Sequence, residues 1–274
     1  GSMIGGIQPS AVAYMSDNTK PSERAKGMAL IGMASGIGTM IGPVLGGGLA
    51  FIHPLFPMYV GALIAIFGGF LAMKYLKEPE VRNLESPSSS LRFYDKRIFP
   101  FLFGWCIAFL VFTGTQVIAA FFIEDKLGVI GQSEIIKATS ISLLSMALTT
   151  TLMQAVVLQI FSISSQTLLR ICFLIFGSVL IAITHVENLS QFYLAFSGIG
   201  VAFSMITPGL NAGATLSVES NEQGEVAGLL AAAPVVGMIF GPPLEAFLYN
   251  LDMTYPFYYG GLLTLILGAY FQFI

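Results

Sequence analysis

The sequence predicts an all-α membrane protein, a bundle of transmembrane helices, on three observations. Hydrophobic residues make up 55% of the 274 residues and charged residues only 10%, whereas soluble domains carry roughly 25% charged residues. Eight apolar runs reach the length of about 20 residues that a spanning helix needs, and a partial run precedes them. The runs are continuously apolar and do not alternate in polarity, which favours helices over a β-barrel.

The positions of the runs and of the charges predict a topology. The partial run lies near residues 3 to 15, and the full runs lie near 24 to 52, 57 to 76, 98 to 123, 136 to 161, 166 to 186, 190 to 215, 224 to 249 and 255 to 274. Nine of the twelve basic residues fall near two connections, around residues 20 to 26 and 74 to 97, which two helices separate. Because an even number of crossings places both connections on one side, the positive-inside rule predicts that side to be cytoplasmic.

One apolar run has an unusual composition. It contains Gly38, Gly42, Pro43, Gly46 and Gly47 within ten residues. In a soluble helix each interior Gly costs about 1 kcal/mol and Pro about 3 kcal/mol. In a membrane, Gly lets neighbouring backbones come close, and neighbouring helices satisfy the groups that Pro leaves unpaired. This run is therefore predicted to be a tightly packed, bent transmembrane helix.

The sequence repeats itself at an offset of 199 residues. Prolines and glycines stay in register over three helices, so that Gly38 aligns with Gly237 and Gly42-Pro43 with Gly241-Pro242. Both copies are expected to cross the membrane in the same direction, as in a parallel repeat of two halves. Three helices precede the second copy and none precede the first. We therefore expect about 100 residues and three helices to be missing before Gly1 in a truncated sequence, the alternative being a natural half-sized protein.

The segment Gly38-x-x-x-Gly42-Pro43-x-x-Gly46-Gly47 resembles motif C of the drug:proton antiporters of the major facilitator superfamily. The loop segments at 22–25 and 221–228 resemble loops of tetracycline and multidrug exporters. The resemblance implies a partial major facilitator fold running from the end of helix 4 to helix 12. It implies an incomplete N-terminal half at 1–76, a cytoplasmic linker at 77–97 and a six-helix C-terminal half at 98–274.

The resemblance also implies a function. The protein would export small amphipathic compounds or drugs in exchange for protons, by alternating access, as a monomer in a bacterial inner membrane. The bilayer, the substrate and protons would be its partners, with no nucleic acid, cofactor or metal. The alternatives are a carrier for a metabolite such as a sugar, amino acid or organic acid, and a truncated membrane protein that does not transport. An enzyme is not expected, because the chain has only two His, both at helix ends, and no Gly-x-Ser-x-Gly or His-Glu-x-x-His pattern.

For the Gly-Pro stretches, the functional interpretation is a bend that seals the outward side of the cavity, and the alternative is ordinary close helix packing. In the second copy, Pro243 and Glu245 replace the continuation of the motif. The first copy is therefore expected to carry the antiporter-specific role, and Gly237, Gly241 and Pro242 a mainly structural one.

Candidates for the substrate cavity follow from spacing and from the resemblance. Trp105, Phe109, Phe112 and Gln116 are separated by four, three and four residues, which places them on one helix face. Aromatic rings there would offer stacking and cation–π contacts to flat cationic compounds, although a stripe facing lipid would have the same spacing. The resemblance adds Asn211 and Gln8 as hydrogen-bonding candidates, and interhelical polar contact is the alternative.

Glu245 is the only carboxylate well inside an apolar run after the linker. An ionisable residue inside a membrane is by default a functional candidate, and burial would favour its neutral form, as a proton-coupling group requires. Its position about twenty residues into its helix also allows a carboxylate at the outer membrane interface.

Overall fold

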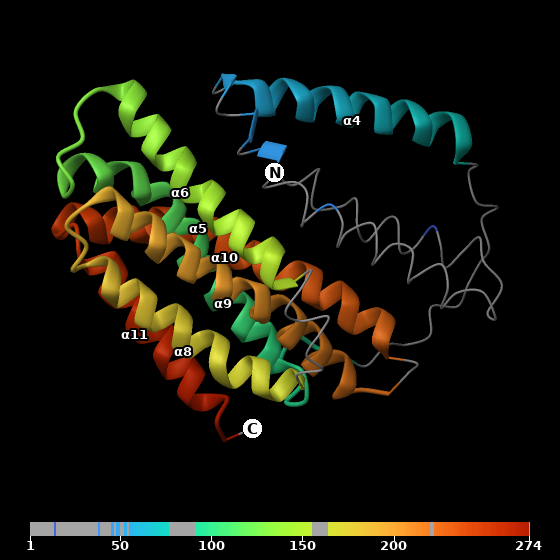
Figure 1. The fold of residues 1–274 in the computed structure, drawn as a ribbon. Coiled ribbons are helices and arrows are strands. Elements are labelled where there is room, and N and C mark those ends of the chain that lie inside the picture. Colours follow the sequence, from blue (N-terminus) through green and yellow to red (C-terminus); the bar gives the residue numbers. More distant parts are fainter. Residues whose placement is uncertain are drawn as a thin grey trace. The chain divides into compact units, whose positions relative to one another are not determined.

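The prediction of an all-helical protein is confirmed by a computed structural model (Figure 1). It describes residues 14, 38, 45–46, 48–49, 52–53, 55–76, 91–154, 164–219 and 222–273. All regular secondary structure among these residues is helical. Two units divide the chain, Gly1–Ser89 and Ser90–Ile274. The division falls inside the predicted linker, most of which lies outside the described residues, as does most of the predicted helix at 24–52.

In the first unit the main described helix is α4, Phe56–Tyr75. It is apolar on all sides, with Lys74 as its one charged residue, as expected of a helix that crosses a membrane. Pro57 stands in the first turn, where its missing N–H has no intrahelical partner to lose.

In the second unit the described residues form six helices, which pack as a bundle. They are α5 (Phe99–Asp125), α6 (Gln132–Leu152), α8 (Ser165–Ile183), α9 (Leu189–Leu216), α10 (Gln223–Leu251) and α11 (Tyr255–Tyr270). Ser164 and Asn188 cap α8 and α9 by accepting the backbone N–H of Thr167 and Gln191 at 3.2 and 3.0 Å. Between α5 and α6 the chain turns at Gly131, whose positive φ of 98° favours glycine.

Four interior prolines stand in two of these helices: Pro208 in α9, and Pro234, Pro242 and Pro243 in α10. Such residues would break most soluble helices.

Among the described helices, α4, α5, α6, α8, α9 and the Glu225–Leu251 part of α10 are long and apolar enough to cross a membrane. At 16 residues, α11 is shorter. Six helices of this kind indicate a multi-pass integral membrane protein.

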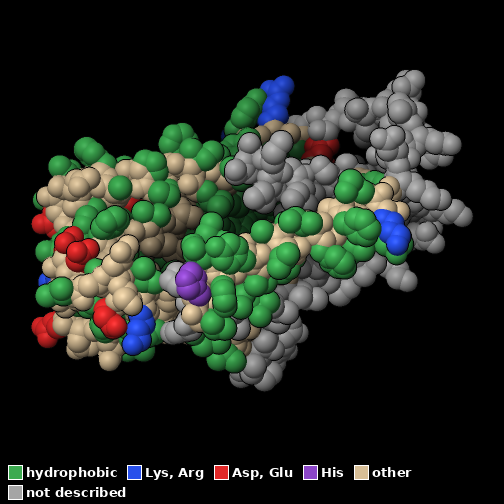
Figure 2. Space-filling view, turned by 90° about the horizontal axis from the view of Figure 1, so that it is seen from above, with side chains coloured by type: hydrophobic (Ala, Val, Ile, Leu, Met, Phe, Trp, Pro, Cys, Tyr) green, Lys and Arg blue, Asp and Glu red, His purple; other side chains and the backbone are tan. Residues whose placement is uncertain are grey.

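The helices of the second unit pack in a defined order (Figure 1). α10 runs along α5, α9 lies between α6 and α8, and α11 packs mainly on α8. The buried core joins all six, and its largest fully buried side chains are phenylalanines such as Phe122, Phe173 and Phe196. Hydrophobic side chains cover the long sides of the helices, and acidic and basic side chains gather at the ends (Figure 2).

Polar contacts join α5 and α10 near both of their ends. At one end the Arg97 guanidinium donates to both carboxylate oxygens of Glu222, at 2.9 and 3.0 Å, and also pairs with Asp95 at 2.9 Å. At the other end the Tyr249 hydroxyl donates to Asp125 at 2.8 Å. Hydrogen bonds from the Arg97 side chain hold the pKa of both Asp95 and Glu222 below the ordinary carboxyl value.

Candidate functional site

The predicted aromatic face of α5 exists and is part of a larger cluster. Trp105 and Phe109 have ring centroids 5.4 Å apart, and Phe109 and Phe112 are 5.8 Å apart. Phe203 of α9 completes the group: its ring stacks on Phe112 at 3.9 Å and meets Phe109 edge-on at 5.9 Å. We call Trp105, Phe109, Phe112 and Phe203 the aromatic cluster.

The cluster has a polar edge. The indole Nε1–H of Trp105 donates to the Asn211 side-chain oxygen at 3.2 Å, and Asn211 itself is exposed. The structure therefore brings together Trp105, Phe109, Phe112 and Asn211, which were predicted from two separate parts of the sequence. This contact also fits the alternative of an interhelical polar contact, so the substrate role of Asn211 stays a prediction.

Two predicted cavity residues are not brought into this group. Gln116 is half-buried and forms no hydrogen bond within the described part of the chain, although its spacing places it on the same face of α5. Gln8 lies outside the described residues, as do Gly42, Pro43 and Gly47 of the first Gly-Pro stretch. Gly38 and Gly46 are described and helical.

Sequence reasoning missed Phe203 and its buried neighbour Phe176 of α8, which meets Phe203 edge-on at 5.5 Å. Both helices are rich in apolar residues, so composition does not single these two out. A weak signal exists, because Phe192, Phe196 and Phe203 recur at spacings of four and seven along α9.

The second Gly-Pro stretch lies against the backbone of α5. A Cβ added at Gly241 would meet the Leu110 carbonyl group, and one added at Gly237 would meet the Cys106 carbonyl oxygen and the Leu110 amide nitrogen. Glycine is thus what allows the two backbones to touch. This contact supports the structural role expected of Gly237 and Gly241.

Glu245 lies further along the same interface. Its side chain is fully buried, packed against Gly114 of α5. Thr115 of α5 donates to Oε2 at 3.5 Å, and Oε1 has no hydrogen-bond partner within the described residues.

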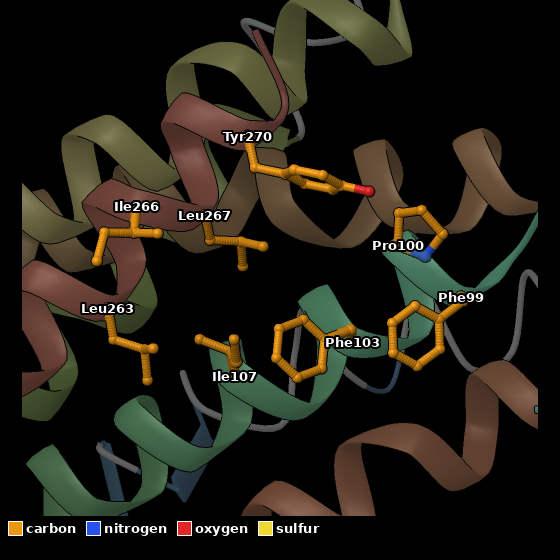
Figure 3. A pocket seen from close by; sticks show the side chains of 8 residues that line it. All are labelled: Phe99, Pro100, Phe103, Ile107, Leu263, Ile266, Leu267 and Tyr270. Atoms are coloured by element: carbon orange, nitrogen blue, oxygen red, sulfur yellow. The ribbon is translucent and has the colours of Figure 1, made fainter. Parts of the chain in front are cut away.

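A groove opens on a different face of α5, toward α11 (Figure 3). Its volume is about 340 Å³. Its lining residues are Phe99, Pro100, Phe103 and Ile107 of α5 and Leu263, Ile266, Leu267 and Tyr270 of α11. The Tyr270 hydroxyl is the one polar side-chain group among them, so the groove lacks the several convergent polar groups that orient a bound molecule. No group of three or more metal-ligating side chains occurs in the residues that the structure describes.

Comparison with known proteins gives consistent matches. The family model for the Major Facilitator Superfamily matches residues 1–162, which is more than half of the chain. "Multidrug resistance protein 1" and "Multidrug resistance protein 2" of Bacillus subtilis (strain 168) are 28% and 26% identical, over 97% and 95% of this chain and 70% and 67% of their own lengths. "Tetracycline resistance protein, class B" of Escherichia coli is 24% identical over 88% of this chain and 61% of its own length.

Proposed function

Because the chain belongs to the Major Facilitator Superfamily of membrane transporters, we propose that it exports small amphipathic compounds in exchange for protons. The observation that carries this proposal is its similarity, along nearly the whole chain, to relatives whose names denote resistance to several drugs and to tetracycline. The motif-C-like sequence from Gly38 to Gly47, typical of antiporters, supports export over uptake.

Transport would proceed by alternating access, with the substrate bound near the middle of the membrane. The aromatic cluster and Asn211 supply chemistry suited to this role. Aromatic faces attract flat cations through stacking and cation–π contacts, and the exposed Asn211 amide offers hydrogen bonds at the edge of the cluster. Gln8 and Gln116 are further candidates for polar contacts.

The distribution of basic residues supports an orientation with the 77–97 linker in the cytoplasm. Glu222 and Arg97, which join α5 to the loop before α10, would lie on that side as well. We place the protein in a bacterial inner membrane as a monomer. Export would then move compounds from the Arg97 end of α5 toward its Asp125 end.

The test is energy-dependent efflux of ethidium, a fluorescent amphipathic cation, from cells that express the full-length gene. We expect ethidium to leave against its gradient, and the efflux to stop when a protonophore collapses the proton gradient. A control strain carries the empty vector. Efflux that follows a sodium gradient, or uptake of a sugar or amino acid without dye export, would contradict the proposal and favour a metabolite carrier.

A further inference from the structure

Glu245 occupies a site built by two residues of α5. Gly114 leaves the space for it: a Cβ added there would lie 2.6 Å from Glu245 Cγ and 2.7 Å from Oε2. Thr115 supplies the single hydrogen bond, to Oε2. Within the described part of the chain, Oε1 is buried and unpartnered, so the site has room and polarity for a carboxyl group but leaves one of its oxygens unsatisfied.

No positive charge in the surrounding helices balances a carboxylate at this place. The sequences of α5, α9, α10 and α11 contain no Lys, Arg or His. Their other titratable residues are Cys106, Glu124, Asp125, Tyr193, Glu225, Tyr249, Tyr255, Tyr258, Tyr259 and Tyr270.

Basic residues do occur at the nearer end of the bundle, but they are exposed. Lys126, Lys137 and His185 face outward there, and Lys137 approaches Glu134 at 3.9 Å. Lys126 lies eleven residues beyond Thr115 along the chain, or roughly 16 Å of helix. Arg170 stands near the start of α8, where its backbone carbonyl accepts a hydrogen bond from Gln272 at the opposite end of the bundle. Tyr249 directs its hydroxyl to Asp125.

An isolated charge in such a place is unfavourable. Burying an ionised carboxylate without a partner costs several kcal/mol, whereas a neutral carboxylic acid costs far less. The packed interface between α5 and α10 therefore accommodates Glu245 as the acid, and exposure of the same interface to water would favour the carboxylate.

We propose that Glu245 is the proton-binding site of this transporter. The proton is taken from water onto the carboxylate, held while α5 and α10 are packed together, and returned to water when the interface around Gly114 opens. No other reactant is consumed. The inference rests on the proposed function, because it names the group that couples drug export to protons.

The position of the site on α5 gives the coupling a physical route. Trp105, Phe109 and Phe112 face α9 from one side of this helix, and Gly114 contacts Glu245 from another. A compound that binds at the aromatic cluster and shifts α5 would therefore change the space around Glu245. Proton and drug binding would then be linked, each altering the affinity for the other by the same factor.

The experiment uses the full-length protein in liposomes, with ethidium as the probe and Glu245→Gln as the variant. The amide resembles the protonated acid in shape and cannot titrate. We expect ethidium exchange without a pH gradient to persist in the variant. Ethidium transport driven by a pH gradient should fall by about tenfold or more, within the usual range of coupling factors, and its pH dependence should flatten. Glu225→Gln, which removes an acid from the first turn of the same helix, is the matched control and should leave the coupling unchanged.

Two further variants test the inference if the Glu245→Gln protein cannot be reconstituted into liposomes. Glu245→Asp keeps a titratable group and should keep coupling with a changed pH profile, and Thr115→Val should shift the pH midpoint of coupling while ethidium exchange persists. If the unmodified protein is proton-coupled and Glu245→Gln remains equally so, or if both second variants behave as the parent, the inference is wrong and the proposed function stands. If the unmodified protein moves ethidium without protons, the proposed function itself fails.

Discussion

At the scale of single residues, Phe203 links α9 to the predicted aromatic face of α5. Its ring stacks on Phe112 with centroids 3.9 Å apart. Phe203→Leu keeps most of the side-chain volume but removes the aromatic ring. We expect it to weaken ethidium binding by about threefold to tenfold, because an aromatic pair, here ethidium with Phe203, contributes about 0.5–1.5 kcal/mol beyond its buried area. Ethidium fluorescence titration of the purified full-length protein measures this directly.

The matched control is Phe192→Leu. Phe192 is a buried phenylalanine of the same helix, but it packs on Phe122 and Phe196, away from the aromatic cluster. Both substitutions should lower thermal stability to a similar extent, and only the change at Phe203 should weaken binding. Equal loss of ethidium affinity in the two variants would show that the aromatic cluster has no special part in binding.

Periodicity within one helix could predict the aromatic face of α5, because residues separated by three or four lie together whatever surrounds them. It could not predict that Phe203 stacks on Phe112, since that depends on how α9 is rotated and placed against α5. The buried state of Glu245 has the same origin. Its place along α10 follows from the sequence, but its burial depends on Gly114 of another helix, which provides the space that encloses it.

At the scale of elements, the interface of α5 and α10 depends on glycine. A Cβ at Gly241 would meet the carbonyl carbon of Leu110 and the hydroxyl of Thr113, each at 2.9 Å. Since backbone cannot move aside as a side chain can, Gly241→Ala should destabilise the protein by about 1–3 kcal/mol. Gly228 of the same helix has no atom within 4 Å of an added Cβ among the described residues. Gly228→Ala should therefore be neutral or stabilising by up to about 1 kcal/mol.

Unfolding of both alanine variants in detergent, followed by circular dichroism, distinguishes close packing from helix propensity. If propensity dominated, both alanines would stabilise α10. If the contact with α5 dominates, the two variants move in opposite directions from the parent protein.

The ion pair of Arg97 with Glu222 should make the junction of α5 and α10 sensitive to acid. Because Arg97 holds the pKa of Glu222 below its ordinary value, the contribution to stability is present at neutral pH and is lost as the pH falls through the lowered pKa. Glu222→Gln should therefore unfold at a slightly lower temperature than the parent at neutral pH, with the difference vanishing in strong acid.

Unfolding temperatures measured over a pH series test this, with Glu187→Gln as control. The Glu187 carboxylate forms no ion pair among the described residues, so its replacement should change little at any pH. A difference for Glu222→Gln that persists unchanged into acid would mean that lost packing, not lost charge, is responsible.

At the scale of the whole molecule, the internal repeat has a structural counterpart. α4 begins at Phe56 and α11 at Tyr255, and 255 − 56 gives the same offset of 199 residues that aligns the two Gly-Pro stretches. Both helices carry a proline in their first turn. The helices among the described residues were predictable because an apolar run of bilayer length is a local signal. The packing partners of the described helices in the second unit were not predictable, because they depend on contacts between residues far apart in sequence.

The two Gly-Pro stretches should differ in what they do for transport. In the second copy, Gly241 contacts the α5 backbone, so a bulkier residue there should reduce the amount of folded protein. The first copy carries the complete motif, and a bulky residue at Gly42 should impair the sealing of the cavity during transport. Measured as ethidium transport per amount of folded full-length protein in liposomes, Gly42→Leu should therefore lose more activity than Gly241→Leu. Equal specific activities would mean that both stretches serve packing alone.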